Sequence, residues 1–270
     1  MQMPISVKQI MAFTKRDAIS WATYKTAAVI SIINIFVAVL SWGIGASYVN
    51  KPVTIMYNTD YISFLFVSVA ISNLLMPLVQ GVSQLNPWTL ETILMTGVNT
   101  TVFILGQIMW TYIFSMITFV PYLFIGILFF HVHLDINYIA LILAFVISAA
   151  ILVGLAMIST GLRIVTKSTD PVTYVLNTLQ SLFSGSVFPV IYLDVILFPG
   201  ASLVSWLLPQ TWVYHLCRLS MLSNPSLMDP IFWLEILAGA AFAVVLFPAG
   251  YKIFTWGLNR SKKEGTLGWY

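Results

Sequence analysis

Residues 138–161 read YIALILAFVISAAILVGLAMISTG, an apolar run without a single charged side chain. A helix that crosses the hydrocarbon core of a bilayer needs about 20 residues of this kind. Similar runs recur along the chain, and none alternates between apolar and polar residues as the strands of a membrane β-barrel do. The sequence therefore predicts an all-α integral membrane protein with six transmembrane helices, at 27–49, 61–81, 101–130, 138–161, 171–192 and 231–251.

The composition of the whole chain excludes several other classes of protein. Of its 270 residues, 59% are hydrophobic and 8% are charged, and the mean hydropathy is +0.93. Soluble domains have about 25% charged residues, and disordered chains are far less hydrophobic. A single cysteine, Cys217, excludes a disulfide scaffold. The net charge of +3, without a basic cluster interleaved with aromatic residues, predicts no nucleic-acid partner.

The distribution of lysine and arginine predicts the orientation in the membrane. If the N-terminus is cytoplasmic, six spans also return the C-terminus to the cytoplasm. The segments outside then contain only Lys51 and Arg218. The segments inside contain the other ten basic residues, Lys8, Lys15, Arg16, Lys25, Arg163, Lys167, Lys252, Arg260, Lys262 and Lys263. Ten against two is the bias expected for this orientation.

Residues 1–26, which precede the first span, have the pattern of an interfacial helix. Charged residues in this segment and the lack of an apolar core predict that it is not a cleavable signal peptide. The residues that recur at helical spacing are Val7, Ile10, Met11, Thr14, Ala18 and Trp21. Such a helix can lie in the plane of the lipid headgroups. The alternative is a positively charged anchor with no further role.

The sequence contains no pattern that predicts covalent chemistry. It has no HExxH zinc motif, no GxSxG nucleophile motif and no GxxxxGK[ST] phosphate loop. We therefore expect no catalytic residue, no metal site and no cofactor in this chain, and any ATP to be hydrolysed by another subunit. His131 and His133, two residues apart on a predicted outer turn, are more typical of solvated histidines than of metal ligands. No charged residue lies in the middle of the six runs, which argues against proton-coupled transport.

Residues 84–98, QLNPWTLETILMTGV, predict a short helix between the second and third spans, over 86–97. Asn86 suits the N-cap, Pro87 the first helical position and Gly97 the residue after the helix. The charge of Glu91 lies in the N-terminal half, where the helix dipole favours an anion. On the cytoplasmic side, such a helix can rest on lipid headgroups or dock into a protein groove.

Several segments of the chain resemble the permease subunits of type-2 ATP-binding-cassette exporters. Thr89-Leu90-Glu91, followed by Ile93-Leu94, is similar to the cytoplasmic G-T-L-E-x-L loop of that family, although Trp88 stands where glycine is usual. Residues 184–189, SGSVFP, resemble the S-G-x-x-[FY]-P motif at the outer end of the fifth span. Residues 208–211, LPQT, with Tyr214 and Arg218, resemble the P-x-[TS] motif that leads to the last span. The apolar segment 193–208 is similar to an outer re-entrant hairpin, and 257–270 to a basic cytoplasmic tail.

The resemblance implies a transmembrane domain over 27–256 that pairs with a second permease copy in the plasma membrane of a prokaryote. An ABC ATPase subunit, which holds ATP and Mg, would bind below each copy and drive export of a neutral or amphipathic solute. The residues implied in ATPase coupling are Trp88, Thr89, Leu90, Glu91 and Ile93. Those implied in an outer gate are Gly185, Phe188 and Pro189. We expect the pathway to be lined by Ser68, Ser72, Asn73, Asn177 and Gln180, which recur at about helical spacing on the second and fifth spans. The alternatives are another transporter subunit, an importer or a facilitator, and an integral membrane protein without a transport role.

Overall fold

The computed structural model describes residues 7–47, 52–53, 57, 59–83, 100–166, 178 and 182–263. Most of these residues are helical, as predicted. The long helices are α1 (Val7–Thr23), α2 (Lys25–Ser47), α3 (Tyr61–Ser83), α5 (Thr100–Phe130), α6 (Tyr138–Thr166), α10 (Pro209–Leu222) and α11 (Pro230–Lys263). The short elements are β1 (Pro52–Val53), β2 (Thr59–Asp60), the 3-10 turn η1 (Val190–Tyr192), α8 (Leu193–Ile196) and α9 (Ala201–Leu207). β1 and β2 pair antiparallel.

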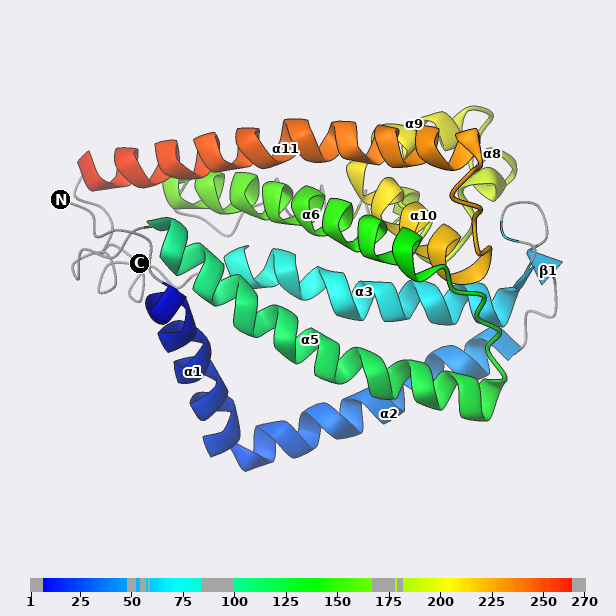
Figure 1. The fold of residues 1–270 in the computed structure, drawn as a ribbon, viewed down its shortest axis with the longest axis horizontal. Coiled ribbons are helices and arrows are strands. Elements are labelled where there is room, and N and C mark those ends of the chain that lie inside the picture. Colours follow the sequence, from blue (N-terminus) through cyan, green and yellow to red (C-terminus); the bar gives the residue numbers. More distant parts are fainter. Residues whose placement is uncertain are drawn as a thin grey trace.

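The long helices form a bundle whose ends differ in structure (Figure 1). α3, α5, α6 and α11 extend along the long axis, and α2 lies along one side. α1 lies across the bundle direction at one end, whereas α8, α9 and β1 lie at the other. The largest buried apolar cluster is formed mainly by α3, α6, α10 and α11, with Phe64, Ile151 and Phe254 among its members. α10 is thus an internal element of the bundle, although its sequence is only moderately apolar.

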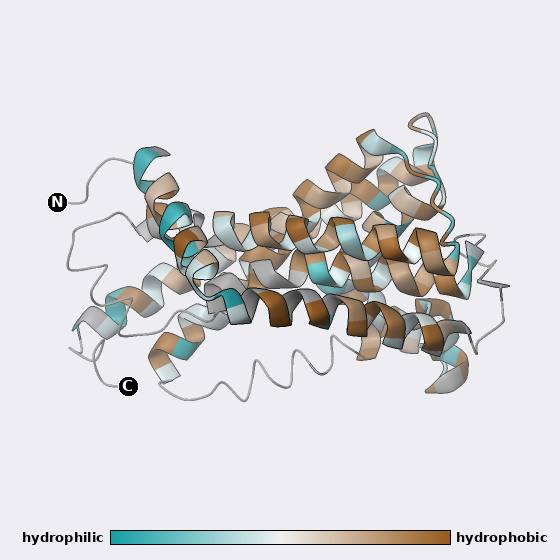
Figure 2. Cartoon of the chain, turned by 90° about the horizontal axis from the view of Figure 1, so that it is seen from below, coloured by the Kyte–Doolittle hydropathy of each residue, from teal (hydrophilic) through white to brown (hydrophobic). Residues whose placement is uncertain are grey.

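Among the described residues, three helices are long and apolar enough to cross a membrane, over Met109–Phe130, Tyr138–Thr166 and Pro230–Ser261. Phe36–Ala46 and Tyr61–Leu75 form shorter apolar segments of α2 and α3. α5 passes through Pro121 as one helix. Most of the predicted fifth span, 171–192, lies outside the described residues. Figure 2 shows the apolar residues concentrated along the bundle. The protein is therefore a helical protein embedded in a membrane, and the count of six spans stays a prediction.

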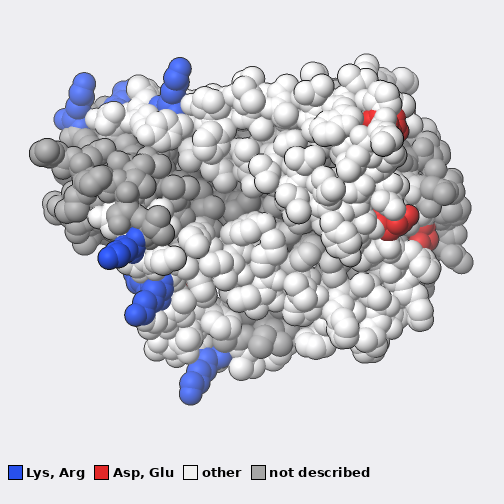
Figure 3. Space-filling view, viewed as in Figure 1, with Lys and Arg blue, Asp and Glu red and all other residues white. Residues whose placement is uncertain are grey.

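Charged side chains are segregated between the two ends of the bundle (Figure 3). In that view, lysine and arginine gather at the end where α1 lies, and aspartate and glutamate gather at the opposite end. The described surface between them carries no charged side chain in this view. An uncharged band between two charged ends is the surface that a bilayer requires. Its basic end corresponds to the side that the sequence assigns to the cytoplasm.

The helix α1 packs two aromatic side chains, Phe13 and Trp21, on α5. The ring of Trp21 meets the ring of Phe114 edge-on, with their centroids 5.5 Å apart. Gly106 of α5 makes room for Phe13, because a Cβ at that glycine would lie 2.8 Å from the Cβ of Phe13. Lys8, Met11 and Lys15 are exposed, so Met11, which the sequence pattern groups with Trp21, faces outward.

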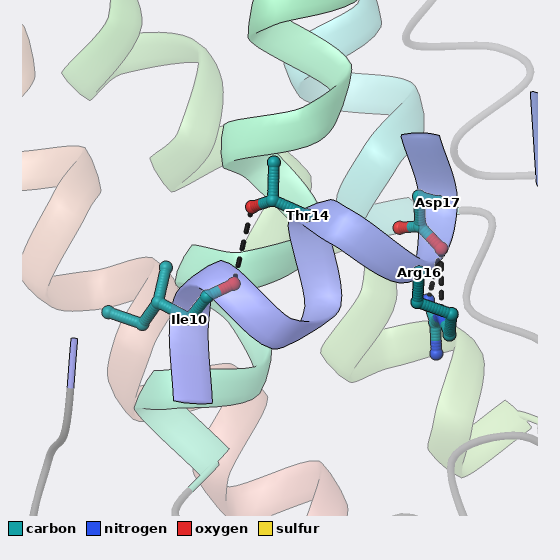
Figure 4. A network of polar contacts seen from close by, with 4 residues as sticks. All are labelled: Ile10, Thr14, Arg16 and Asp17. Carbon is teal, nitrogen blue, oxygen red and sulfur yellow. Dashed lines mark hydrogen bonds and ion pairs between the residues drawn. The ribbon is translucent and has the colours of Figure 1, made fainter. Parts of the chain in front are cut away.

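Polar contacts within α1 are local (Figure 4). The Thr14 hydroxyl donates to the carbonyl oxygen of Ile10, 3.2 Å away. Arg16 pairs with the adjacent Asp17 at 2.6 Å. Both bonds join neighbours along α1, whereas the aromatic contacts of Trp21 and Phe13 join α1 to α5.

α6 and α11 touch through their backbones at two pairs of glycines. A Cβ at Gly257 would lie 2.5 Å from the carbonyl oxygen of Gly161, and a Cβ at Gly250 would overlap the carbonyl oxygen of Gly154. Both pairs follow the same chain order, so the two helices run parallel. Small residues at seven-residue spacing let membrane helices approach closely, where van der Waals contact replaces the hydrophobic effect as the driving force.

Candidate functional site

The most unusual buried group is the guanidinium of Arg218, on α10. Its side chain is only 1% exposed and is the largest fully buried side chain among the described residues. Its Nε donates to the Ser68 hydroxyl on α3 at 2.8 Å. Its terminal nitrogen Nη2 donates to the carbonyl oxygens of Gly185 and, at 3.2 Å, Ser186. Arg218 thus joins α10 to α3 and to the segment that precedes η1.

Aromatic rings complete the surroundings of this cation. The guanidinium carbon lies 4.2 Å from the ring centroid of Phe64 and 5.3 Å from that of Tyr214. A desolvated cation over an aromatic face gains about 2 kcal/mol. Within the described residues, no carboxylate forms an ion pair with Arg218. Carbonyl groups, the Ser68 hydroxyl, the Tyr57 phenol and two rings therefore replace water around this charge.

A second polar chain lies beside Arg218 and ends at the surface. The Tyr57 hydroxyl lies 2.9 Å from His215 Nδ1, and His215 Nε2 lies 3.2 Å from Glu235 Oε1. Burial raises the pKa of the Tyr57 phenol, so the phenol stays protonated and donates to Nδ1. A carboxylate only accepts, so these partners assign the neutral imidazole proton to Nε2. The contact between Nε2 and Oε1 does not have the geometry of a hydrogen bond. It is an electrostatic contact, which becomes an ion pair when the imidazole is protonated.

These three residues come from three separate elements. Tyr57 lies between β1 and β2, His215 is on α10 and Glu235 is on α11. The side chain of His215 is 8% exposed and that of Glu235 is 27% exposed. Trp206 and Trp212 pack edge-on against the imidazole, with centroid distances of 5.0 and 6.1 Å. The indole rings shield one side of the imidazole, and the carboxylate connects the other to water.

Three of the predicted pathway-lining residues, all on α3, are described, and their surroundings differ. Ser68 is fully buried and donates to the Phe64 carbonyl oxygen at 2.5 Å. Ser72 is partly buried, with its hydroxyl 2.7 Å from that of Tyr214 on α10. Asn73 is exposed. Ser68 and Ser72 thus face α10 within the chain, and Asn73 faces outward. Asn177 and Gln180 lie outside the described residues.

The predicted outer-gate residues lie at the same end of the bundle as α8 and α9. Gly185 is buried with a φ of +70°, and a Cβ there would lie 2.7 Å from the Cγ2 of Val190. A left-handed backbone in such a tight space suits glycine. Phe188 is 50% exposed, and the Pro189 carbonyl accepts from Tyr192 N at 3.0 Å, which starts η1. The gate itself stays a prediction, but Gly185 is bound directly by Arg218.

Asp194 closes the turn between α8 and α9. One carboxylate oxygen accepts from the Ser202 amide at 2.7 Å, and the other accepts from the Ser202 hydroxyl at 2.6 Å. The side-chain bond from Ser202, followed by the backbone bond, lowers the pKa of the carboxyl. Gly200, with a φ of +94°, makes the turn possible. The segment 193–208 thus contains two short helices, and its re-entry into the membrane stays a prediction.

Replacing Ser202 by alanine is expected to loosen this turn. The lost hydroxyl bond should let the α9 amides exchange hydrogen a few times faster at neutral pH, because exchange reports local opening. Hydrogen exchange followed by mass spectrometry would measure this, with Ser226→Ala as a control in another outer turn.

The same bonds predict a pH dependence of the turn. A carboxyl whose pKa is lowered by folding stabilises the folded turn above its ordinary pKa of about 3.9 and loses this as the pH falls through the lowered value. Hydrogen exchange of the α9 amides, relative to the intrinsic rate of an unstructured chain at the same pH, should therefore accelerate only in strong acid.

For the Ser202→Ala variant, an exchange rate in α9 equal to that of the wild type at neutral pH would show that the turn does not depend on the Ser202 hydroxyl bond.

The predicted coupling residues, Trp88, Thr89, Leu90, Glu91 and Ile93, lie outside the described residues, as does the helix predicted at 86–97. His131, with a φ of +53°, and His133 are both exposed. Within the described part of the chain, no three His, Cys, Asp or Glu side chains are grouped so that they could hold a metal ion.

Tyr57, His215 and Glu235 were not predicted as site residues, and Arg218 was predicted only as an outer charge and as part of the motif that begins at residue 208. One signal was present for Glu235, because it is the only charged residue within the six apolar runs. An ionisable residue in such a run is by default a candidate functional residue. Arg218 offered no comparable signal, because its segment is polar enough to be a surface helix. No family model, curated protein or solved structure matches this chain.

Proposed function

We propose that the chain is the permease subunit of an ATP-driven exporter of the type-2 ATP-binding-cassette class. The observation that carries the proposal is the set of bonds from Arg218 to Gly185 and Ser186. These residues belong to the two separate motifs, at 184–189 and from 208 onward, that give the second half of the chain its resemblance to that class. Two motifs that pack on each other through a buried cation are more consistent with one structural unit than with chance similarity.

The distribution of charge supports the same proposal. Basic residues at one end of the bundle and acidic residues at the other fit a plasma-membrane protein with both termini in the cytoplasm (Figure 3). In this proposal, the chain has six spans and 193–208 enters the outer leaflet. The pathway lies between two copies and carries a neutral or amphipathic solute, and ATP with Mg binds to the ATPase subunit.

Purification of the tagged chain from its native membrane tests the proposal. A soluble ATPase with a GxxxxGK[ST] loop should co-purify, and the complex in nanodiscs should hydrolyse ATP. A chain that mediates solute flux without such a partner would be a facilitator. A chain that retains neither partner nor flux would not be a transport subunit.

Replacing Glu91 by lysine is expected to weaken the complex by tenfold or more in affinity. Glu91 is the only charge between Asp60 and Asp135, so no neighbour in that loop can replace its ion pair. Reversing a charge at a desolvated contact costs several kcal/mol. Co-purification and ATP hydrolysis measure the effect, with insertion of the variant checked separately.

Lys167→Glu is the matched control, because it reverses a charge in the other predicted cytoplasmic loop of the transmembrane domain. It should weaken the complex less than Glu91→Lys. If Glu91 only rests on headgroups, lysine there would be tolerated or favourable. Wild-type binding and hydrolysis by Glu91→Lys would remove the loop 86–97 from the ATPase contact.

A further inference from the structure

We propose that Tyr57, His215 and Glu235 form a proton-sensitive latch that holds the outer end of the bundle closed and tightens when His215 is protonated. Its role in gating export rests on the proposed function above, whereas its response to pH does not. The three residues connect the outer segment between β1 and β2, α10 and α11 by contacts of 2.9 and 3.2 Å. Opening of the bundle between these elements must break at least one of the two contacts.

His215 is placed to exchange a proton with the outer solvent. Imidazole is the side chain whose charge changes between about pH 5 and pH 8. Its ring is almost completely buried, but the contacting carboxylate of Glu235 remains partly exposed. The neutral ring carries its proton on Nε2, so the second proton binds at Nδ1 and requires a transient opening of the contact between Nδ1 and the Tyr57 hydroxyl.

Both charge states of His215 are compatible with its neighbours. In the neutral ring, Nε2–H faces Glu235 and Nδ1 accepts from Tyr57. In the protonated ring, Nδ1 also becomes a donor. The Tyr57 hydroxyl then rotates and accepts this hydrogen bond, because a hydroxyl can act as donor or as acceptor. The contact with Glu235 then becomes an ion pair.

The sign of the effect follows from the charges that face the imidazole. Glu235 of α11 is in direct contact and attracts the imidazolium. Arg218 of α10 repels it, but acts across Tyr57, with whose phenol it interacts. α9 contributes the uncharged ring of Trp206, α3 contributes Phe64 beside Tyr57, and α6 has no charged residue before Arg163. Because Glu235 contacts the imidazole directly, at 3.2 Å, acid is expected to strengthen the latch.

The chain contains its own reporter of opening. Cys217 is its only cysteine, lies on α10 between His215 and Arg218, and is fully buried. The rate at which 4,4′-dithiodipyridine modifies it is the intrinsic thiol rate multiplied by the population of the open state. Dividing the rate of a variant by the wild-type rate at the same pH cancels the intrinsic pH dependence of the thiol.

The experiment compares these ratios in nanodiscs, without any ATPase, at about pH 8 and about pH 5.5. On acidification, the labelling rate of His215→Gln divided by that of the wild type should rise about fivefold. Only the wild type gains an ion pair in acid, and a partly desolvated ion pair contributes a factor of about this size. Glu235→Gln should show a similar rise, and the double variant should show no further rise. His131→Gln and His133→Gln, which change the two exposed histidines of the chain, should leave the ratio near one at both pH values.

A ratio for His215→Gln that is flat with pH, or that falls in acid, would overturn the proposal. If His215→Gln does not fold, Glu235→Gln gives the same test, because it removes the charge with which the imidazolium pairs. If the acid effect is found but no ATPase associates with the chain, the latch stands and the proposed function fails. If an ATPase associates but labelling does not depend on pH, the proposed function stands and the latch fails.

Discussion

Replacing Arg218 by methionine is expected to destabilise the protein by about 3–5 kcal/mol, because the groups that the buried guanidinium binds lose a charged donor. Methionine fills much of the volume of arginine. However, it removes the guanidinium bonds to the carbonyl groups of Gly185 and Ser186 and to the Ser68 hydroxyl, and a lost hydrogen bond to a charged group costs about 1.5–3 kcal/mol. For a chain of this size, the melting temperature should fall by about 10 °C.

A thiol-reactive fluorescent dye can follow this transition, because Cys217 becomes accessible when α10 unfolds. Arg16→Met is the matched control, since Arg16 is partly exposed and pairs with Asp17 on α1, and surface pairs contribute at most about 1 kcal/mol. Arg218→Lys should lie between the two, because an ammonium keeps the charge but not the planar fork or the stacking on Phe64. Wild-type melting of Arg218→Met would show that the buried cation does not stabilise the outer end.

Gly250→Leu is expected to cost about 3 kcal/mol by forcing α6 and α11 apart. Any side chain at Gly250 meets the backbone of Gly154, which cannot move aside as a flexible side chain does. Overpacking of a fitted interface costs about 1–3 kcal/mol, and separating the two helices also weakens their van der Waals packing along the whole interface. Thermal unfolding of the variant in detergent micelles measures the effect.

Gly45→Leu in α2 provides the control, because a Cβ at Gly45 meets nothing within 4 Å. That change should be neutral or slightly stabilising, since glycine is a poor helix former by about 1 kcal/mol. Equal melting temperatures for the two variants would contradict direct backbone contact between α6 and α11.

The hydrophobic runs predicted the first residues of the long helices more accurately than their last residues. α6 begins at Tyr138, as predicted, but continues to Thr166, and α11 continues past the predicted span to Lys263. Apolarity marks the part of a helix that lies in lipid, whereas the backbone hydrogen bonds of the helix continue into water until a cap or breaker ends them.

The candidate site was less predictable, because it depends on which elements meet in space. Nothing in the sequence near Arg218 indicates that carbonyl groups from residues 185 and 186 will surround it. Asn73 and Ser68 have the same kind of polar side chain in one apolar run, yet one is exposed and the other is buried under Arg218. Periodicity assigns residues to faces of a helix, but not the neighbour that each face meets.

The glycine contacts between α6 and α11 also restrict how the bundle can change shape. Two parallel helices whose backbones touch at positions a full two turns apart cannot slide or roll past each other without a clash. They therefore move as one rigid rod. α10 is attached to the outer end of this rod at Cys217, whose sulfur lies 3.6 Å from the Ser148 hydroxyl of α6. Motion that opens the outer end is therefore expected where α3, α10 and Tyr57 meet this rod.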